Sequence, residues 1–184
     1  ILVDRMIETS DDSLYTAALC SDFALEGRRA GEFLVRKFAG RTTPVNIVEL
    51  AGTAFSTPAI GRSEGFREVL SAHPKFVICF SEDGDFMQSK GREIMQKVLK
   101  LYRSDEIDVL YSHNDDMTFG VIEVMKEAGL APGKDIVIIS VDATQRSIDY
   151  LREGTINCVI ECNPNSGQQV MELATRIVSG ENVP

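Results

Sequence analysis

The sequence lacks the features that mark membrane-spanning and nucleic-acid-binding chains. No apolar run approaches the ~20 residues that a membrane-spanning helix needs, and no basic-then-apolar signal peptide opens the chain. The 19 Lys and Arg residues are outnumbered by 28 Asp and Glu residues, which gives a formal net charge of −9. Because a field of that sign repels phosphate backbones, we expect no nucleic-acid partner.

Catalytic and metal-binding motifs are also missing. The sequence has only two histidines and no G-x-S-x-G, H-E-x-x-H or Walker motif. His113 could in principle act as a general base beside Asn114 and Asp115, but no nucleophile with an orienting partner accompanies it. The four cysteines have apolar neighbours and no C-x-x-C spacing, so we predict small core residues, with no metal and no cofactor. They are Cys20, Cys79, Cys158 and Cys162.

What the chain does contain is a regular alternation of strand-like apolar runs and helix-length amphipathic segments. This pattern predicts an α/β fold with a mostly parallel sheet covered by helices. Helical spacing of apolar residues is found around 24–38, 94–101 and 121–125, and a further helix is predicted over 56–72. The chain opens inside a strand, so we expect its natural N-terminus to lie upstream. The predicted strands lie near 1–3, 16–20, 45–50, 76–80, 108–112, 136–141 and 157–161.

Polar residues gather just beyond the predicted strands, partly in loops expected at 53–58 and 81–85. Ligands of open α/β sheets bind at the carboxyl ends of the strands. Carboxylates, amides and arginines can exchange hydrogen bonds with the hydroxyls of a neutral polyol, and Phe86 could cover the apolar face of a sugar. The polar set comprises Asp4, Arg5, Ser21, Asp22, Arg62, Asp85, Asn114, Asp115, Asp116, Asp142, Glu161 and Asn163.

Each of these residues also has a structural interpretation. Asp and Asn after a strand are ordinary helix caps, and we assign Asp22 and Asp116 mainly to capping. Arg62 lies inside the predicted 56–72 helix and would by default be a solvated surface residue. The repetition of such groups at successive strand ends favours binding for the set as a whole.

Short motifs run along essentially the whole chain in a specific order: Leu2-Val3-Asp4-Arg5, Glu49-Leu50-Ala51-Gly52-Thr53, Arg62-Ser63-Glu64-Gly65-Phe66, Gly84-Asp85-Phe86, His113-Asn114-Asp115-Asp116-Met117, Val141-Asp142 and Asn163-Pro164. In order and spacing they resemble the ribose-type sugar-binding proteins of bacterial ABC importers, and within them the galactofuranose-binding branch. The resemblance implies a type I periplasmic-binding-protein fold. In that fold two Rossmann-like lobes, joined by three crossing segments, close around one sugar, and the closed form docks on a membrane permease.

The resemblance also implies a division of the chain and a location. Residues 1–20 would be a remnant of the N-terminal lobe, 21–161 a nearly complete C-terminal lobe, and 162–184 a segment returning to the N-terminal lobe. The protein would be periplasmic or otherwise extracytoplasmic, and lipid-anchored at the membrane surface in a Gram-positive bacterium.

The matching positions imply six sugar contacts and no chemical change of the ligand. Two would come from the N-terminal side and four from the C-terminal lobe, with Phe86 packing on the sugar ring. The implied ligand is a neutral monosaccharide, either a pentose or a furanose-form hexose. Cys162 stands where relatives often carry Gln, which weakens any assignment on that segment. The six residues are Asp4, Arg5, Arg62, Phe86, Asn114 and Asp142.

Two other classes of protein share this fold. One is the effector-binding core of a lac-repressor-type transcriptional regulator, which would carry a helix-turn-helix upstream. The other is a sugar-binding input domain fused to a membrane kinase or chemoreceptor. The Asn-Asp-Asp-Met and Asp-Arg motifs favour the transport receptor over the regulator.

Overall fold

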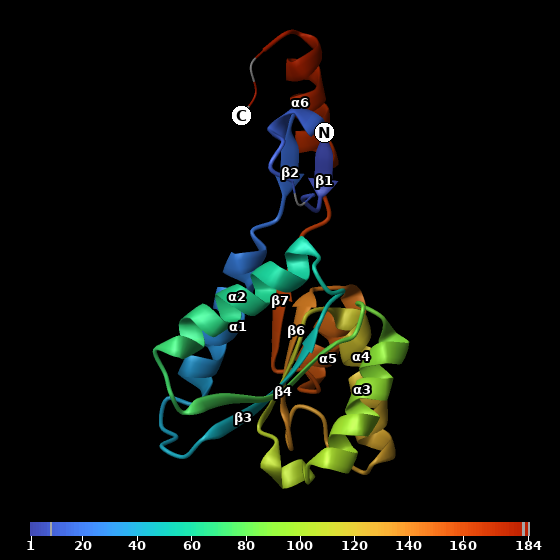
Figure 1. The fold of residues 1–184 in the computed structure, drawn as a ribbon. Coiled ribbons are helices and arrows are strands. Elements are labelled where there is room, and N and C mark those ends of the chain that lie inside the picture. The colour runs from blue at the N-terminus through green and yellow to red at the C-terminus, as the bar shows by residue number, and fades with distance from the viewer. Residues whose placement is uncertain (8, 182, 184) are drawn as a thin grey trace.

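The computed structural model describes residues 1–7, 9–181 and 183, in which strands alternate with helices over most of the chain (Figure 1). All seven predicted strands are present, and each boundary lies within three residues of the prediction. They are β1 Leu2–Asp4, β2 Ala18–Cys20, β3 Val45–Ala51, β4 Phe76–Asp83, β5 Val109–Ser112, β6 Val137–Asp142 and β7 Cys158–Glu161. The helices are α1 Phe23–Lys37, α2 Thr57–Ser71, α3 Gln88–Leu101, α4 Asp115–Glu127, α5 Gln145–Glu153 and α6 Gly167–Val178, with short 3-10 turns at Asp12–Leu14 and Ser104–Glu106.

The predicted loop over 81–85 is wrong at its start. Strand β4 continues through Asp83, because its last three residues pair with Glu49, Leu50 and Ala51 of β3. The loop that follows is therefore short, and it carries Phe86 directly into α3.

Five strands form one parallel sheet in the order β4-β3-β5-β6-β7. The chain moves outward from β3 to β4 and then returns to the other side of β3 for β5, so the strand order reverses there. Ligands of open α/β sheets bind outside the carboxyl ends of the strands at such a reversal. Among the described residues, β1 and β2 pair only with each other.

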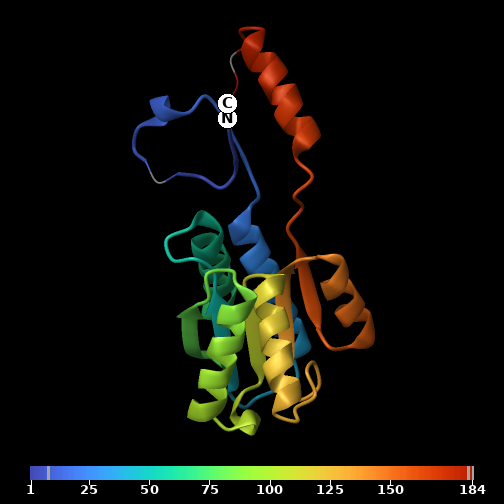
Figure 2. The same cartoon turned by 90° about the vertical axis from the view of Figure 1, so that its right-hand side faces the viewer.

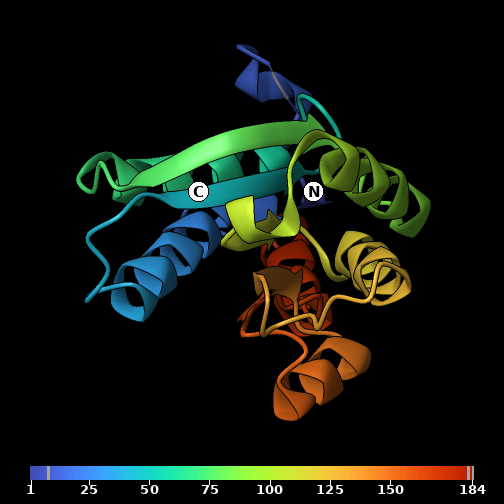
Figure 3. The same cartoon turned by 90° about the horizontal axis from the view of Figure 1, so that it is seen from below.

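The five-stranded sheet is covered on both faces, because successive residues of a strand point to opposite sides. Val48 and Leu110 belong to one core with α3 and α4, whereas Ile47, Val109 and Tyr111 belong to the other core with α1 and α2. Figure 1 shows these two helix pairs on opposite sides of the strands, and the view from below in Figure 3 shows the same arrangement. The predicted α/β class with a helix-flanked parallel sheet is thus confirmed.

The ends of the chain lie apart from the sheet's two cores. Figure 2 shows the first 20 residues and α6 standing above the five-stranded body. Only two thin connections, near residues 21–22 and 162–166, join them to the body in the same view. Within the described part of the chain, no helix is both long and apolar enough to cross a membrane.

Helices α1 and α2 approach each other closely through glycines. A Cβ on Gly27 would lie 2.2 Å from the carbonyl oxygen of Arg62, and a Cβ on Gly65 would lie 2.0 Å from that of Ala24. The two backbones therefore touch where any larger residue would separate them. This contact is what brings Glu26 of α1 against Arg62 of α2 and removes both side chains from water.

Two predicted helix caps have different outcomes. Asp22 caps α1 as predicted, since its carboxylate accepts a hydrogen bond from the Leu25 N–H at 2.8 Å. The cap predicted for Asp116 is wrong, because α4 begins at Asp115, two residues earlier than a cap at Asp116 would require. Asn114 is the cap and accepts from the Met117 N–H at 3.0 Å, while Asp116 lies exposed in the first turn.

Candidate ligand-binding site

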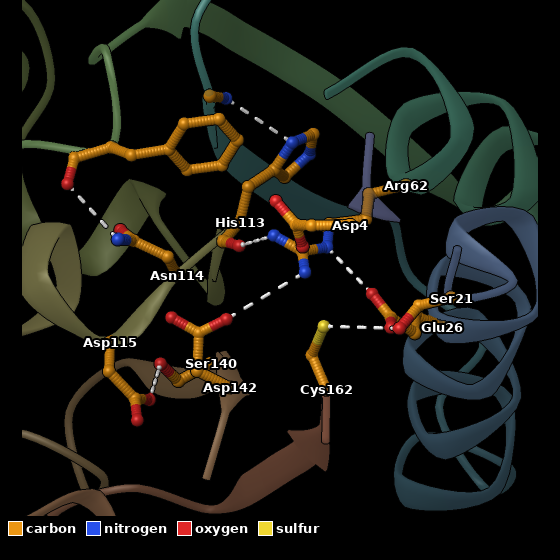
Figure 4. Close-up of polar contacts among 12 residues, drawn as sticks. Asp4, Ser21, Glu26, Arg62, His113, Asn114, Asp115, Ser140, Asp142 and Cys162 are labelled. Atoms are coloured by element: carbon orange, nitrogen blue, oxygen red, sulfur yellow. Dashed lines mark hydrogen bonds and ion pairs between the residues drawn. The ribbon is translucent and has the colours of Figure 1, made fainter. Parts of the chain in front are cut away.

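The structure brings all six predicted site residues to one pocket of about 140 Å³. The pocket lies at the carboxyl ends of the strands, where the strand order reverses. Figure 4 shows side chains from β1, α2, α4 and the end of β6 converging there. The predicted residues that line it are Asp4, Arg5, Arg62, Phe86, Asn114 and Asp142.

Arg62 is the buried cation of this pocket, with 3% of its surface exposed. The interpretation of Arg62 as a solvated surface residue is therefore excluded. Its Nε donates to Glu26 Oε2 at 2.8 Å, and Nη1 donates to the carbonyl oxygen of His113 at 2.6 Å. Nη2 lies 3.7 Å from Asp142 Oδ1. Burial works against the charge, but the neighbouring Glu26 and Asp142 carboxylates hold the pKa of Arg62 above its usual value.

Asp142 is the last residue of β6 and faces Arg62 across the pocket. Burial raises the pKa of its carboxyl to about 7, against the opposing effect of Arg62 and with a further contribution from the nearby Asp115. No side-chain hydrogen bond to its carboxylate oxygens is seen in the described residues, although the Asp115 backbone N–H acts to lower its pKa. Asp142 can therefore still accept hydrogen bonds from a ligand.

Phe86 presents its ring to the pocket from the loop between β4 and α3. The ring lies on Gly52, where a Cβ would be only 1.9 Å from Cζ of the ring. The guanidinium carbons of Arg5 and Arg62 lie 5.3 Å and 5.9 Å from the ring centre. A flat ring with cations beside it is a suitable surface for the C–H groups of a sugar.

Asn114 has two structural hydrogen bonds and some capacity left. Its Oδ1 accepts from Met117, and its Nδ2 donates to the carbonyl oxygen of Phe86 at 3.0 Å. A side-chain amide has two N–H donors and two acceptor sites. One of each therefore remains for a ligand.

Asp4 and Arg5 reach the pocket from the end of β1 and form an exposed ion pair at 3.3 Å. Together with Arg62 and Asp142 they supply two carboxylates and two guanidinium groups. These four charges cancel, so the pocket suits a neutral ligand that can both donate and accept hydrogen bonds.

Three of the six residues have strained backbones. The φ angles of Asp4, Phe86 and Asp142 are 72°, 60° and 119°, in the region that favours glycine. Such conformations cost of order 1–3 kcal/mol each and persist at functional sites when the surrounding structure enforces them. Nothing in the sequence signalled this strain, because none of the three positions is Gly or Asn.

The sequence reasoning missed four residues of the site. Phe23, Pro58 and Cys162 also line the pocket, and Glu26 holds Arg62 from behind. Glu26 could have been found from the sequence, because it lies on the same face of α1 as Phe23, three residues before it, and Ala30, four residues after it. A carboxylate on a buried helix face needs a cationic partner.

The Cys162 thiol is half-buried and donates to Ser21 Oγ at 3.6 Å, as Figure 4 shows. The other three cysteines are also half-buried. Cys79, Cys158 and Cys162 pack against the two cores, so the predicted core position holds in part for these three.

His113 is fully buried and serves the structure. Its Nδ1 accepts from the Gly52 N–H at 3.3 Å, and its Nε2 lies 3.3 Å from Glu49 Oε1. Burial lowers the pKa of His113 below its usual value. Burial acts against the charge of Glu49, yet hydrogen bonds from His113, Arg67 and Ser81 hold the pKa of Glu49 well below its usual range. Both ring nitrogens are occupied, so His113 has no free nitrogen to serve as a general base.

A second and larger hollow, of about 310 Å³, lies between β1, β2 and the start of α6. It shares only Asp4 with the predicted site and contains no buried charged side chain. Among the described residues, no group of three or more His, Cys, Asp or Glu side chains is placed to hold a metal ion. The smaller pocket, with its buried Arg62, is the better candidate.

The family model for the periplasmic binding protein domain matches residues 1–182. The chain belongs to the periplasmic binding protein family. It is 41% identical over 165 residues to the galactofuranose-binding protein YtfQ of Escherichia coli (strain K12), a match that covers 89% of this chain and 51% of that protein. The predicted resemblance to the galactofuranose-binding branch is thereby confirmed.

Solved structures of periplasmic binding proteins agree with this assignment. A Mycobacterium smegmatis protein in complex with β-D-fucofuranose is 43% identical, with a TM-score of 0.93 over all of this chain and 60% of that one. The periplasmic component of the arabinose ABC transporter from Shewanella sp. ANA-3, bound to α- and β-L-arabinofuranose, is 37% identical, with a TM-score of 0.92 over 98% of this chain and 59% of that one. The chain thus spans between half and two thirds of the length of these relatives.

Proposed function

We propose that this chain forms one wall of a sugar-binding cleft in the solute receptor of a bacterial ABC importer. The observation that carries the proposal is the pocket in which two arginines, one of them buried, meet two carboxylates, an amide and an aromatic ring. The relatives named above are described as binding galactofuranose, fucofuranose and arabinofuranose. The ligand we propose is therefore a neutral monosaccharide, either a pentose or a furanose-form hexose.

We assign 21–161 to one lobe, and 1–20 with 162–184 to the other. This division is supported by the separate β1–β2 sheet and by the position of both chain ends above the five-stranded body (Figure 2). In this assignment Asp4 and Arg5 contact the sugar from one side. Arg62, Phe86 and Asn114 contact it from the other, together with Asp142.

The proposed receptor leaves its ligand chemically unchanged. The charged groups of the pocket are held in ion pairs and hydrogen bonds that suit recognition of hydroxyls, and His113 is occupied at both ring nitrogens. The further partner we propose is the membrane permease of the importer. The place we propose is the periplasm or, in a Gram-positive cell, the outer face of the cytoplasmic membrane, where a lipid would anchor the protein. The structure and the named relatives give no support to the regulator alternative.

Isothermal calorimetry on the full-length gene product tests this function. The titrants are arabinose, ribose, fucose, galactose and fructose, whose solutions contain furanose forms, with glutamine and adenosine as comparison ligands. We expect tight binding of at least one sugar, recovery of that sugar unchanged, and no binding of the comparison ligands. Tight binding of only the amino acid or the nucleoside, or release of an altered sugar, contradicts the proposal.

A further inference from the structure

Asp115 is a buried carboxylate that is not among the six predicted sugar contacts. It is 1% exposed and lies between Asn114, which lines the pocket, and the exposed Asp116. Asp115 itself does not line the pocket, so it cannot touch a ligand there. Its two carboxylate oxygens are nevertheless fully used by other groups.

The hydrogen bonds of Asp115 reach the chain on both sides of Asp142. Oδ1 accepts from the Ser140 hydroxyl at 2.6 Å, two residues before Asp142, as Figure 4 shows. Oδ2 accepts from both the N–H and the hydroxyl of Thr144 at 2.8 Å, two residues after it. One carboxylate thus holds the turn at both ends, while φ is 119° at Asp142 and 71° at Ala143 between them.

A strained turn needs such support. Non-glycine residues with positive φ persist only when surrounding contacts enforce them. Hydrogen bonds to an ionised carboxylate are roughly twice as strong as those between neutral groups. The contacts of Asp115 are charge-assisted, and at Ser140 they are removed from water. Without them, the turn loses the contacts that fix the direction of the Asp142 side chain toward Arg62.

The neighbouring Asn114 does the same for the opposite wall. Its Nδ2 donates to the carbonyl oxygen of Phe86, another residue with positive φ. The junction between β5 and α4 therefore ties down the loop after β4 through Asn114 and the loop after β6 through Asp115.

We propose that Asp115 is a positioning residue for ligand recognition, which sets the affinity of the receptor by holding the Asp142 turn. This inference rests on the proposed sugar-binding function. The alternative is that Asp115 only stabilises α4, as an acidic residue in the first turn of a helix commonly does. The two interpretations make different predictions. A helix effect is shared with Asp116, and it does not depend on Asp142.

Asp116→Asn is a matched control for Asp115→Asn. The two residues are adjacent in the first turn of α4, and both changes remove one negative charge at the same helix end. Asp116 is exposed and has no side-chain hydrogen bond among the described residues. Asn at 115 has one acceptor oxygen and no charge, so it can no longer accept from Ser140 and Thr144 at the same time.

The experiment is a double-mutant cycle on the full-length gene product, with the best sugar of the panel as the ligand. We expect Asp115→Asn to weaken affinity roughly tenfold and Asp116→Asn to weaken it by less than about twofold. If Asp115 acts through Asp142, changes at these two residues should couple. In an Asp142→Asn background the further loss from Asp115→Asn should fall below about twofold, whereas in a Phe86→Ala background it should stay roughly tenfold. Thr144→Val removes one donor and keeps the shape of the side chain. It should weaken affinity about threefold, with the same dependence on Asp142, and it replaces Asp115→Asn if that variant fails to fold.

Three results overturn the inference, and they are distinguishable. Equal losses for the Asp115 and Asp116 variants would show a helix effect. A loss that persists undiminished in the Asp142→Asn background would show that Asp115 does not act through Asp142. If the unaltered protein binds no sugar, the proposed function fails and the inference fails with it.

Discussion

The ring of Phe86 rests on the backbone of Gly52, with no room between them for even one methyl group. A Cβ on Gly52 would lie 1.9 Å from Cζ and 2.3 Å from Cε1 of that ring. The same glycine donates its N–H to His113. The end of β3 is therefore shaped to support an aromatic surface at the pocket, and this relationship can be tested directly.

Gly52→Ala should push the Phe86 ring out of place and weaken sugar binding. A lost aromatic contact is worth about 0.5–1.5 kcal/mol, or roughly 2- to 12-fold in Kd. Calorimetry on the variant measures this loss, with Gly40→Ala as the control, because a Cβ there meets nothing within 4 Å. In a Phe86→Ala background the Gly52 change should have no further effect on affinity. A full additional loss there would show that Gly52 acts by another route.

Arg62→Ala should affect both stability and binding. Removing one partner of a buried ion pair typically lowers the free energy of unfolding by about 3–5 kcal/mol, because Glu26 is left buried without a counter-charge. Losing a charged contact to the sugar should cost a further ~2–5 kcal/mol of affinity, or roughly 30- to several-thousand-fold.

A double variant separates these two effects of Arg62. Arg62→Met combined with Glu26→Gln removes both buried charges, so most of the stability should return while the affinity stays low. Chemical denaturation and calorimetry on the same samples provide the two measurements. Recovery of affinity in the double variant would show that Arg62 acts only through Glu26.

The helix caps give predictions that separate stability from affinity. Asp22→Ala removes the cap of α1 and should lower the free energy of unfolding by about 0.5–2 kcal/mol with little change in affinity. Asn114→Ala removes the cap of α4 and also the tether to Phe86, so both stability and affinity should fall. Asp116→Ala should change neither by much, since Asp116 is not the cap. A large stability loss for Asp116→Ala would contradict this assignment.

The sheet and its order of elements could be predicted because each buried strand is rich in apolar residues, which make up five of the seven residues in Val45–Ala51. Polar groups after strands and the family resemblance together gave six of the nine residues that line the candidate pocket. The roles within the site were harder to predict. That Asn114 and not Asp116 caps α4 depends on where the helix begins, to within one or two residues, and that boundary is not encoded by spacing.

The cation that pairs with the buried Glu26 could not be predicted, and the reason is different. The contact of Glu26 with Arg62 requires α1 and α2 to touch at Gly27 and Gly65, a tertiary approach between residues 36 positions apart. The positive φ of Asp142 is imposed by hydrogen bonds from its neighbours to Asp115. Both features arise from packing between distant segments, which a single sequence does not display.

Sugar affinity should depend on pH through Asp142, whose pKa is raised to about 7 by burial. The carboxylate is the form that can accept hydrogen bonds from two hydroxyls, so affinity should rise as the pH increases from 5.5 to about 8 and then level off. Stability should move the other way. Since the folded pKa lies above the ordinary 3.8, the contribution of Asp142 is fully present below 3.8 and is lost as the pH rises through about 7.

Below pH 7, sugar binding should therefore release up to one proton from Asp142. Calorimetry at pH 6.5 in two buffers of different ionisation enthalpy measures this release. Asp142→Asn is the control, since it cannot ionise and should bind weakly with no dependence on pH. The charged groups that face Asp142 are Arg62, Glu26 and Asp115. Net proton uptake by the unaltered protein, or the same pH dependence in Asp142→Asn, would show that another group titrates and that Asp142 is not the acceptor of the sugar hydroxyls.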